Sequence, residues 1–130
     1  MPDFVVARVA EALNSVGKPL NGSRILILGL AYKANVDDDR ESPSYHLMQK
    51  LEEHNAIVGY NDPYIPMIKP TREFSMFAGR KSVEITNDYD LLLIATAHDE
   101  YKKLAFEKFT IPIVDTRNIV KRVNSLVFPS

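Results

Sequence analysis

Two nearly uninterrupted apolar runs constrain the fold more than any other feature of the sequence. Residues 24–30 read RILILGL, and residues 90–96 read DLLLIAT. Neither run alternates apolar with polar residues, as a strand with one face in water does, so both are typical of strands buried on both faces. Because such strands occur in parallel sheets covered by helices, the chain is predicted to be an α/β protein.

The remaining segments supply the expected helices and further strands. A helix is predicted at residues 2–14, and Ser42-Pro43 has the N-cap and first-turn chemistry of a second helix that ends near Asn55. Further strands are expected at 56–60, 83–85 and 111–115, and further helices at 72–78 and 99–108. Pro112 indicates that the last of these strands either lies at an edge or begins there. This order predicts a three-layer, Rossmann-like open parallel sheet with an N-terminal helix.

The composition fits one compact domain and disfavours several classes of partner. The chain has 130 residues, a formal net charge of -1 and no cysteine. A chain of this size can bury a sufficient core without disulfides or metals. The balanced charge argues against nucleic acid, and no apolar run reaches the roughly 20 residues that span a bilayer. We therefore expect a cytoplasmic protein that binds neither nucleic acid nor membrane and carries no thiol nucleophile of its own.

The connection between the first apolar run and the helix at Ser42 is unusually long. Residues 29–41 take about a dozen positions, whereas such loops usually take about 2–6. Ligands of open α/β sheets bind beyond the carboxyl ends of the strands, where this loop must lie. Among its polar residues, Lys33 and Arg40 are the better candidates for facing an anion. A solvated loop that only caps the next helix is the alternative.

Two common site motifs are missing from this loop. A dinucleotide cradle needs G-x-G-x-x-G, but residues 29–34 read GLAYKA. A calcium loop over residues 35–46 would need glycine where Arg40 stands and glutamate where His46 stands. No metal site is therefore predicted, and the aspartates at 37–39 are interpreted as orienting the cations or favouring the start of the next helix.

Three segments carry a family resemblance. Residues 29–43 (GLAYKANVDDDRESP) resemble the signature that opens the carboxy-terminal domain of the UDP-glucose/GDP-mannose dehydrogenase family. Residues 60–66 (YNDPYIP) are similar to its Y-x-D-P segment, and residues 114–118 (VDTRN) to its D-x-R segment. The resemblance implies that residues 1–20 are the tail of a central helical domain. It also implies that residues 21–130 are the carboxy-terminal nucleotide-sugar-binding domain of a longer enzyme.

The resemblance further implies an NAD-dependent dehydrogenase that oxidises the C6 hydroxyl of a UDP-sugar to a carboxylate, as in polysaccharide biosynthesis. The family's cysteine nucleophile and most of its NAD site lie in the amino-terminal and central domains, which would be this chain's partners within the same enzyme. The full-length enzyme is expected to be a homo-oligomer. Carried over by position, Tyr32 and Lys33 would contact the sugar nucleotide, Arg117 the substrate and Arg40 the NAD. The chain alone is expected to hold no catalytic residue and to be inactive. Residues 35–39 look more like the branch that oxidises UDP-N-acetylhexosamines.

Two non-catalytic readings stay open. One is a receiver-like signalling module, which needs an acidic pair directly after the first strand, where this chain has Gly29-Leu30-Ala31. The other is a free-standing α/β ligand-binding module. Asp62-Pro63 is interpreted mainly as a turn after the second strand, and His98 is given no role.

Overall fold

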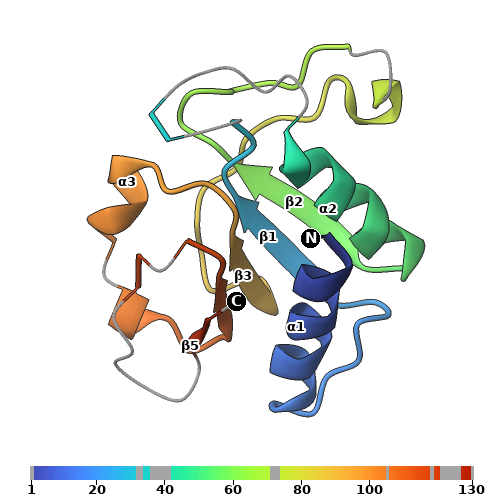
Figure 1. The fold of residues 1–130 in the computed structure, drawn as a ribbon, viewed down its shortest axis with the longest axis vertical. Coiled ribbons are helices and arrows are strands. Elements are labelled where there is room, and N and C mark those ends of the chain that lie inside the picture. The colour runs from blue at the N-terminus through green and yellow to red at the C-terminus, as the bar shows by residue number, and fades with distance from the viewer. Residues whose placement is uncertain are drawn as a thin grey trace.

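A parallel five-stranded sheet is the centre of the structure. The structure is a computed structural model that describes residues 2–31, 34–35, 42–70, 74–104, 106–117, 119–120 and 127–129. The sheet order is β2-β1-β3-β4-β5, and all four pairings are parallel. The strands are β1 (Arg24–Leu28), β2 (Ile57–Asn61), β3 (Leu91–Ile94), β4 (Ile113–Asp115) and β5 (Val127–Pro129). The predicted open parallel α/β sheet is confirmed (Figure 1).

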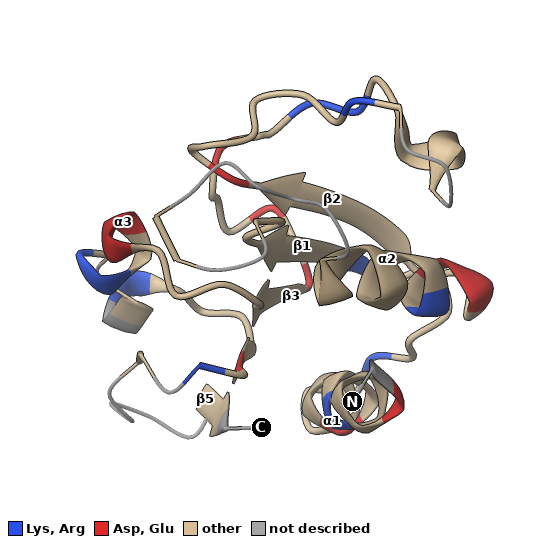
Figure 2. Cartoon of the chain, turned by 45° about the horizontal axis from the view of Figure 1, so that its top comes forward, with Lys and Arg blue, Asp and Glu red and all other residues tan. Residues whose placement is uncertain are grey.

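The sheet is buried on both faces, as the two apolar runs predict. In β1, Ile25 and Ile27 belong to one hydrophobic cluster, whereas Leu26 and Leu28 belong to another. Helices α1 (Pro2–Asn14) and α2 (Pro43–Glu53) cover the first face, as Figure 1 shows. The second face is covered by the one-turn helix α3 (Asp99–Lys102) and the 3-10 turn η2 (Phe106–Lys108). Lys, Arg, Asp and Glu lie mostly on the loops and helices around these strands (Figure 2).

The two long helices form where local sequence signals place them. Ser42 is the N-cap of α2, its hydroxyl accepts a hydrogen bond from the Ser44 amide, and Pro43 follows at the first helical position. Val9 and Leu13 of α1 are fully buried in the same core as α2. No helix among the described residues is long and apolar enough to cross a membrane.

Residues 83–85 and 99–108 differ from the prediction. Residues 83–85 form no strand: the Val83 amide donates to Tyr60 O, but Val83 O accepts from the Asn61 side chain, so no backbone ladder continues. Residues 99–108 are not one helix but α3 followed by η2. Tyr101 and Phe106 are both buried in the same cluster, yet residues five apart point in different directions on a helix. The break lets both rings face the sheet.

The shorter elements also differ from those predicted. The helix expected at 72–78 is the 3-10 turn η1 (Ser75–Phe77), with residues 71–73 outside the described part. Pro112 directly precedes β4, which has a neighbour on each side, so this proline marks a strand start and not an edge. The edge strand next to β4 is β5, which the sequence pattern did not predict.

Candidate functional site

The site expected from the sequence lies at the carboxyl ends of the strands, where the strand order reverses. Successive strands extend the sheet in one direction from β1 to β2 and in the other from β3 to β5. At this reversal the loops after β1 and β3 leave toward opposite faces, and open α/β sheets bind ligands in the crevice between such loops. Four segments meet at the carboxyl edge of the sheet, which is the end where the strands finish: residues 29–31, 61–64, 95–98 and 115–117.

Gly29 sets the path by which the chain leaves β1. Its φ is +105°, and a Cβ added there would lie 2.3 Å from the Cβ and 2.9 Å from the backbone nitrogen of Thr96. Its amide donates to Asn61 O at 2.8 Å, and its carbonyl accepts from the Ser44 hydroxyl at 2.8 Å. The first residue of the long loop is therefore fixed against β2, β3 and the start of α2, and only glycine fits.

Asp62 is the buried centre of this edge. Its side chain has no exposed surface, and Oδ2 accepts hydrogen bonds from the amides of Leu30 (2.8 Å) and Ala31 (3.0 Å). Oδ1 accepts from the Tyr64 amide at 2.8 Å, which confirms the predicted turn at Asp62-Pro63. Burial alone would raise the pKa of this carboxyl, but hydrogen bonds from the His98 ring and three backbone amides hold it below the usual value. Asp62 therefore stays ionised and binds the start of the β1–α2 loop.

His98 uses both ring nitrogens in this network. Nδ1 accepts the Asn35 amide at 2.7 Å, and Nε2 lies 3.0 Å from Asp62 Oδ2. Since Nδ1 accepts a hydrogen bond it carries no proton, so the proton is on Nε2 and is donated to Asp62. The pair is thus a neutral imidazole bonded to a carboxylate. No role was predicted for His98 from the sequence, although it follows a buried strand and therefore lies at the same end of the sheet as Asp62.

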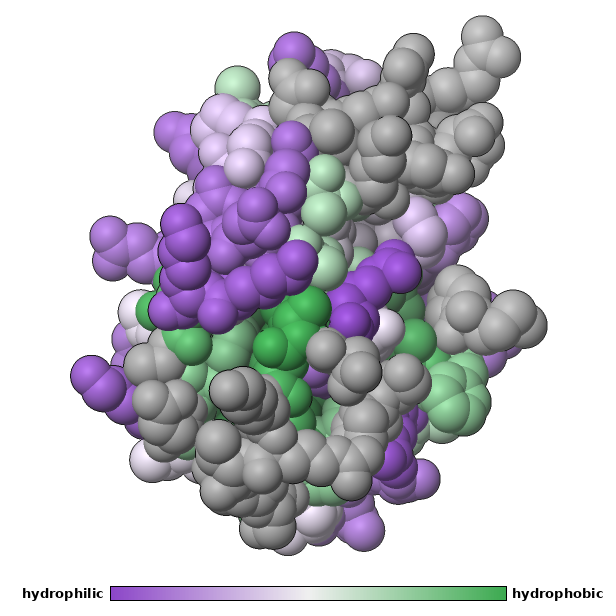
Figure 3. Space-filling model, turned by 60° about the vertical axis from the view of Figure 1, so that its left-hand side comes forward, coloured by the Kyte–Doolittle hydropathy of each residue, from purple (hydrophilic) through white to green (hydrophobic). Residues whose placement is uncertain are grey.

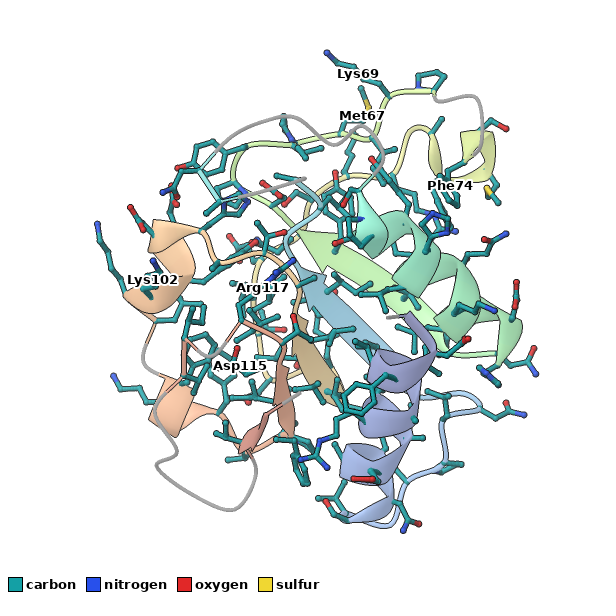
Figure 4. All side chains as sticks on the ribbon, in the orientation of Figure 1. Met67, Lys69, Phe74, Lys102, Asp115 and Arg117 are labelled. Carbon is teal, nitrogen blue, oxygen red and sulfur yellow. The ribbon has the colours of Figure 1, made fainter. Side chains whose placement is uncertain are left out.

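Asp115 and Arg117 form a turn at the end of β4. Asp115 Oδ1 accepts the Arg117 amide at 3.0 Å, and Oδ2 accepts the Val120 amide at 2.7 Å. Arg117 Nε donates to Ala95 O at 3.0 Å, which fixes the exposed guanidinium across the end of β3. Figure 4 shows the Arg117 side chain lying toward the carboxyl ends of the strands. Among the described residues no carboxylate is ion-paired with Arg117. Its two terminal nitrogens can therefore donate to an anionic ligand.

Three of the four predicted site residues fall outside the described part of the chain. These are Tyr32, Lys33 and Arg40, as are the aspartates at 37–39. Tyr32 and Lys33 lie in the sequence between two anchored residues, Ala31 and Asn35. Ala31 O accepts the Thr96 hydroxyl at 3.0 Å, in addition to the bond between its amide and Asp62.

The face that carries α3 is strongly polar. Asp99 and Glu100 begin α3 and are exposed, and Lys102 lies 3.4 Å from Asp99 in an exposed ion pair. The Tyr64 hydroxyl donates to Glu100 at 2.9 Å, and this contact raises the pKa of the phenol. Figure 3 shows hydrophilic side chains gathered in the upper part of this face and hydrophobic ones beneath. Within the described residues no three His, Asp or Glu side chains form a metal-ligand cluster.

Comparisons with known proteins agree on one family. The family model for the UDP-glucose/GDP-mannose dehydrogenase family, UDP binding domain, matches residues 26–122. A UDP-glucose 6-dehydrogenase of Rhizobium meliloti is 30% identical over 86% of this chain and 27% of its own length. A UDP-N-acetyl-D-mannosamine dehydrogenase of Methanocaldococcus jannaschii is 32% identical over 94% of this chain and 28% of its own length.

Solved structures show the same likeness. The structure of a UDP-D-ManNAc dehydrogenase from Pyrococcus horikoshii superposes with a TM-score of 0.77 and 26% identity, covering 99% of this chain and 30% of that one. An NDP-N-acetyl-D-galactosaminuronic acid dehydrogenase from Methanosarcina mazei gives a TM-score of 0.81 at 21% identity, which shows the shared fold. It covers 100% of this chain and 28% of that one. The chain thus spans less than a third of the length of these relatives.

Proposed function

The chain belongs to the UDP-glucose/GDP-mannose dehydrogenase family, and from this premise we propose that it is the nucleotide-sugar-binding domain of an NAD-dependent UDP-sugar 6-dehydrogenase. Residues 21–130 would form this domain, and residues 1–20 would be the tail of a preceding helical domain. The proposed reaction turns the C6 hydroxyl of a UDP-sugar into a carboxylate. That oxidation removes four electrons, so it reduces two NAD⁺ and takes its second oxygen from water.

This chain has no glycine-rich motif that could hold the pyrophosphate of NAD. The five glycines stand at positions 17, 22, 29, 59 and 79, and no two of them are separated by a single residue as in G-x-G-x-x-G. We therefore place the main NAD site in the part of the enzyme that corresponds to the rest of the relatives' length. Arg40 is proposed to reach the cofactor from this side. No cysteine nucleophile is present among the 130 residues, so this chain would bind and orient substrate only.

The anchored guanidinium of Arg117 at the strand-order reversal is the observation that carries the proposal. A planar fork of N–H donors matches the oxygens of a phosphate or a carboxylate. Its Nε is bound to Ala95 O, which orients the terminal nitrogens before a ligand arrives. Lys33 is proposed to supply a compact positive charge to the diphosphate, and Tyr32 to contact the nucleotide sugar. Both follow Ala31, whose amide is bound to Asp62 at the same edge.

The proposal includes partners and a compartment. The UDP-sugar would be enclosed between this domain and the other domains of the enzyme, which we propose to be a homo-oligomer. UDP-sugars and NAD are metabolites of the cytoplasm, so we propose that location. The sugar is proposed to be a UDP-N-acetylhexosamine, because the sequence of residues 35–39 resembles the branch of the family that oxidises such sugars. The named relatives include dehydrogenases of both UDP-glucose and UDP-N-acetyl-D-mannosamine.

Steady-state kinetics on the protein expressed from its complete reading frame tests the proposal. With NAD⁺, a UDP-N-acetylhexosamine should yield two NADH per sugar, followed at 340 nm, and UDP-glucose should react less efficiently. Arg117→Ala should lower kcat/KM by about 100-fold, because a charge-assisted, bidentate contact contributes about 1.5–3 kcal/mol. Lys102→Ala, which removes an exposed charge from the α3 face, is the matched control and should leave kcat/KM unchanged.

Three results would contradict the proposal. Absence of NADH formation with every UDP-sugar tested, while UDP itself still binds, would favour a binding module without catalysis. Normal kcat/KM in an Arg117→Ala, Lys33→Ala double variant would refute the assigned residues. Labelling of the chain by acetyl phosphate would instead identify a receiver-like module.

A further inference from the structure

We infer that His98 is a positioning residue for the β1–α2 loop, joining Ala31 and Asn35 of that loop at the end of the sheet where the nucleotide sugar is proposed to bind. This inference rests on the proposed function, since it assumes that this loop contacts a UDP-sugar. His98 is given no ligand contact of its own. Its side chain is fully buried, and it acts through the backbone of Asn35 and the carboxylate of Asp62.

The hydrogen bonds of His98 connect the two sides of that segment. On one side, Asp62 Oδ2 binds the amides of Leu30 and Ala31. On the other side, His98 Nδ1 accepts the amide of Asn35 at 2.7 Å. The Nε2–H group of the same ring donates to the same Oδ2 atom at 3.0 Å. One imidazole and one carboxylate oxygen therefore hold both ends of a stretch of only three intervening residues.

Asn35 is adapted to this connection. Its φ is +63°, a left-handed conformation that Asn tolerates better than most residues. Its side-chain Oδ1 accepts the Asp99 amide at 2.9 Å, and Asp99 is the first residue of α3. His98, the N-cap residue of α3, makes no side-chain capping bond, so Asn35 provides that bond from the other loop. The end of the segment is thus bound to α3 at two points.

The ring of His98 is itself held in place. Its centroid lies 4.7 Å from that of Tyr64 and 5.5 Å from that of Tyr101. Tyr101 is buried, and its hydroxyl donates to Asn61 O at 2.6 Å, at the end of β2. The Tyr64 hydroxyl is bound to Glu100 of α3. An imidazole packed in this way cannot change its orientation without breaking contacts to the β2 end and to α3.

Fixing both ends of the segment bears on binding. Ala31 and Asn35 are separated by only four Cα–Cα steps of about 3.8 Å, so the two anchored residues lie close together along the chain. A cation held in place before the ligand arrives loses less conformational freedom on binding. Loss of the anchor at Asn35 should therefore weaken binding of a diphosphate by about 10-fold or more, even where the fold persists.

Two substitutions separate the two bonds of the ring. In His98→Asn, the amide oxygen occupies the place of Nδ1 and can accept the Asn35 amide, but nothing reaches Asp62. In His98→Gln, the amide nitrogen occupies the place of Nε2 and can donate to Asp62, but no acceptor remains for Asn35. A merely structural histidine matters through the buried carboxylate, so His98→Gln would then be the milder change in every respect. The positioning role predicts opposite orders for stability and for affinity.

The test measures UDP binding by calorimetry and urea unfolding for both variants, in the protein expressed from its complete reading frame. We expect His98→Gln to be the more stable variant and to bind UDP at least 10-fold more weakly than the wild type. His98→Asn should be the less stable variant and should bind within about threefold of the wild type. Affinities that follow stability in both variants would overturn the inference. A wild-type protein that binds no UDP would instead refute the proposed function.

A measurement on the wild type needs no substitution. Two-bond ¹⁵N–¹H correlation spectra of the histidines report which ring nitrogen carries the proton, and hydrogen exchange reports whether the Asn35 amide is protected. We expect His98 to be the Nε2–H tautomer and the Asn35 amide to exchange slowly, although the residue is exposed. A protonated Nδ1 at neutral pH, or a freely exchanging Asn35 amide, would overturn the inference whatever the variants do.

Discussion

Replacing Asp62 by Asn should destabilise the chain by an amount set by four hydrogen bonds. Asn has the same shape but only one acceptor oxygen. If its NH₂ group replaces Oδ2, three donors lose their acceptor: the Leu30 and Ala31 amides and His98 Nε2. If it replaces Oδ1, only the Tyr64 amide is left without one. The second orientation is cheaper, so Asp62→Asn should adopt it.

The magnitude follows from that orientation. The part-buried Tyr64 amide without an acceptor costs about 1–3 kcal/mol, and the other three bonds lose the added strength of a charged acceptor. We therefore expect the free energy of unfolding to fall by about 2–4 kcal/mol at pH 7, measured by urea denaturation. Asp88→Asn is the matched control, because Asp88 is exposed and its side chain accepts a hydrogen bond from Thr86 of its own turn. It should change the free energy of unfolding by less than about 0.5 kcal/mol.

The pH dependence of the free energy of unfolding provides a second test with the same variant. Asp62 has a lowered pKa in the folded state, so its contribution is fully present above the unfolded value of about 3.8. The contribution is lost as the pH falls from there through the folded-state pKa. The difference between wild type and Asp62→Asn should thus be constant from pH 7 to about pH 5 and shrink below about pH 4. A difference under 0.5 kcal/mol at pH 7, or one independent of pH, would refute the reasoning.

Three further predictions concern other positions. Gly29→Ala should lower the free energy of unfolding by about 2–4 kcal/mol, because a Cβ there combines a positive φ with a clash. Gly22→Ala should lower it by about 1 kcal/mol, because Gly22 has a φ of +84° but lies in open space. Equal urea midpoints for the two variants would contradict this. Asp90→Asn should cost under about 1 kcal/mol, because Asp90 is partly exposed, and the difference should fade below about pH 4, where its lowered pKa no longer favours folding. Burial raises the pKa of Tyr101, so its phenol should not ionise in the pH range in which exposed phenols do. In that range, the absorbance titration at 295 nm should be the same for the wild type and Tyr101→Phe. One ionising group fewer in Tyr101→Phe would contradict the prediction.

The parts of the fold that follow from short-range signals could be predicted. Ser42 and Pro43 fix the start of α2 through a bond between near neighbours, and the apolar runs of β1 and β3 need no partner to be recognised as buried. The break between α3 and η2 could not be predicted, because it depends on Tyr101 and Phe106 both reaching one face of the sheet. A tertiary requirement there overrides a local helical pattern.

The site shows the same division. Arg117 was predicted through the family resemblance of the D-x-R segment, and the turn that this short segment forms is closed within a few residues. Asp62 was predicted mainly as a turn former, since its bonds to Leu30 and Ala31 cross about 30 positions of sequence. His98 depends on contacts that exist only when three strand ends meet. Such long-range bonds leave no periodicity or spacing in the sequence.

Chemical-shift mapping with UDP tests the central claim most directly. In a titration of the ¹⁵N-labelled chain, we predict that the largest amide shifts occur at the carboxyl edge of the sheet, at Ala31, Asn35, Ala95 and Arg117, and that Arg117→Ala weakens the binding. Residues at the opposite edge, where Lys18 and Asp90 form an ion pair, should be unaffected. Shifts confined to that opposite edge, or none at millimolar UDP, would contradict the claim that this chain binds a nucleotide sugar where its strand order reverses.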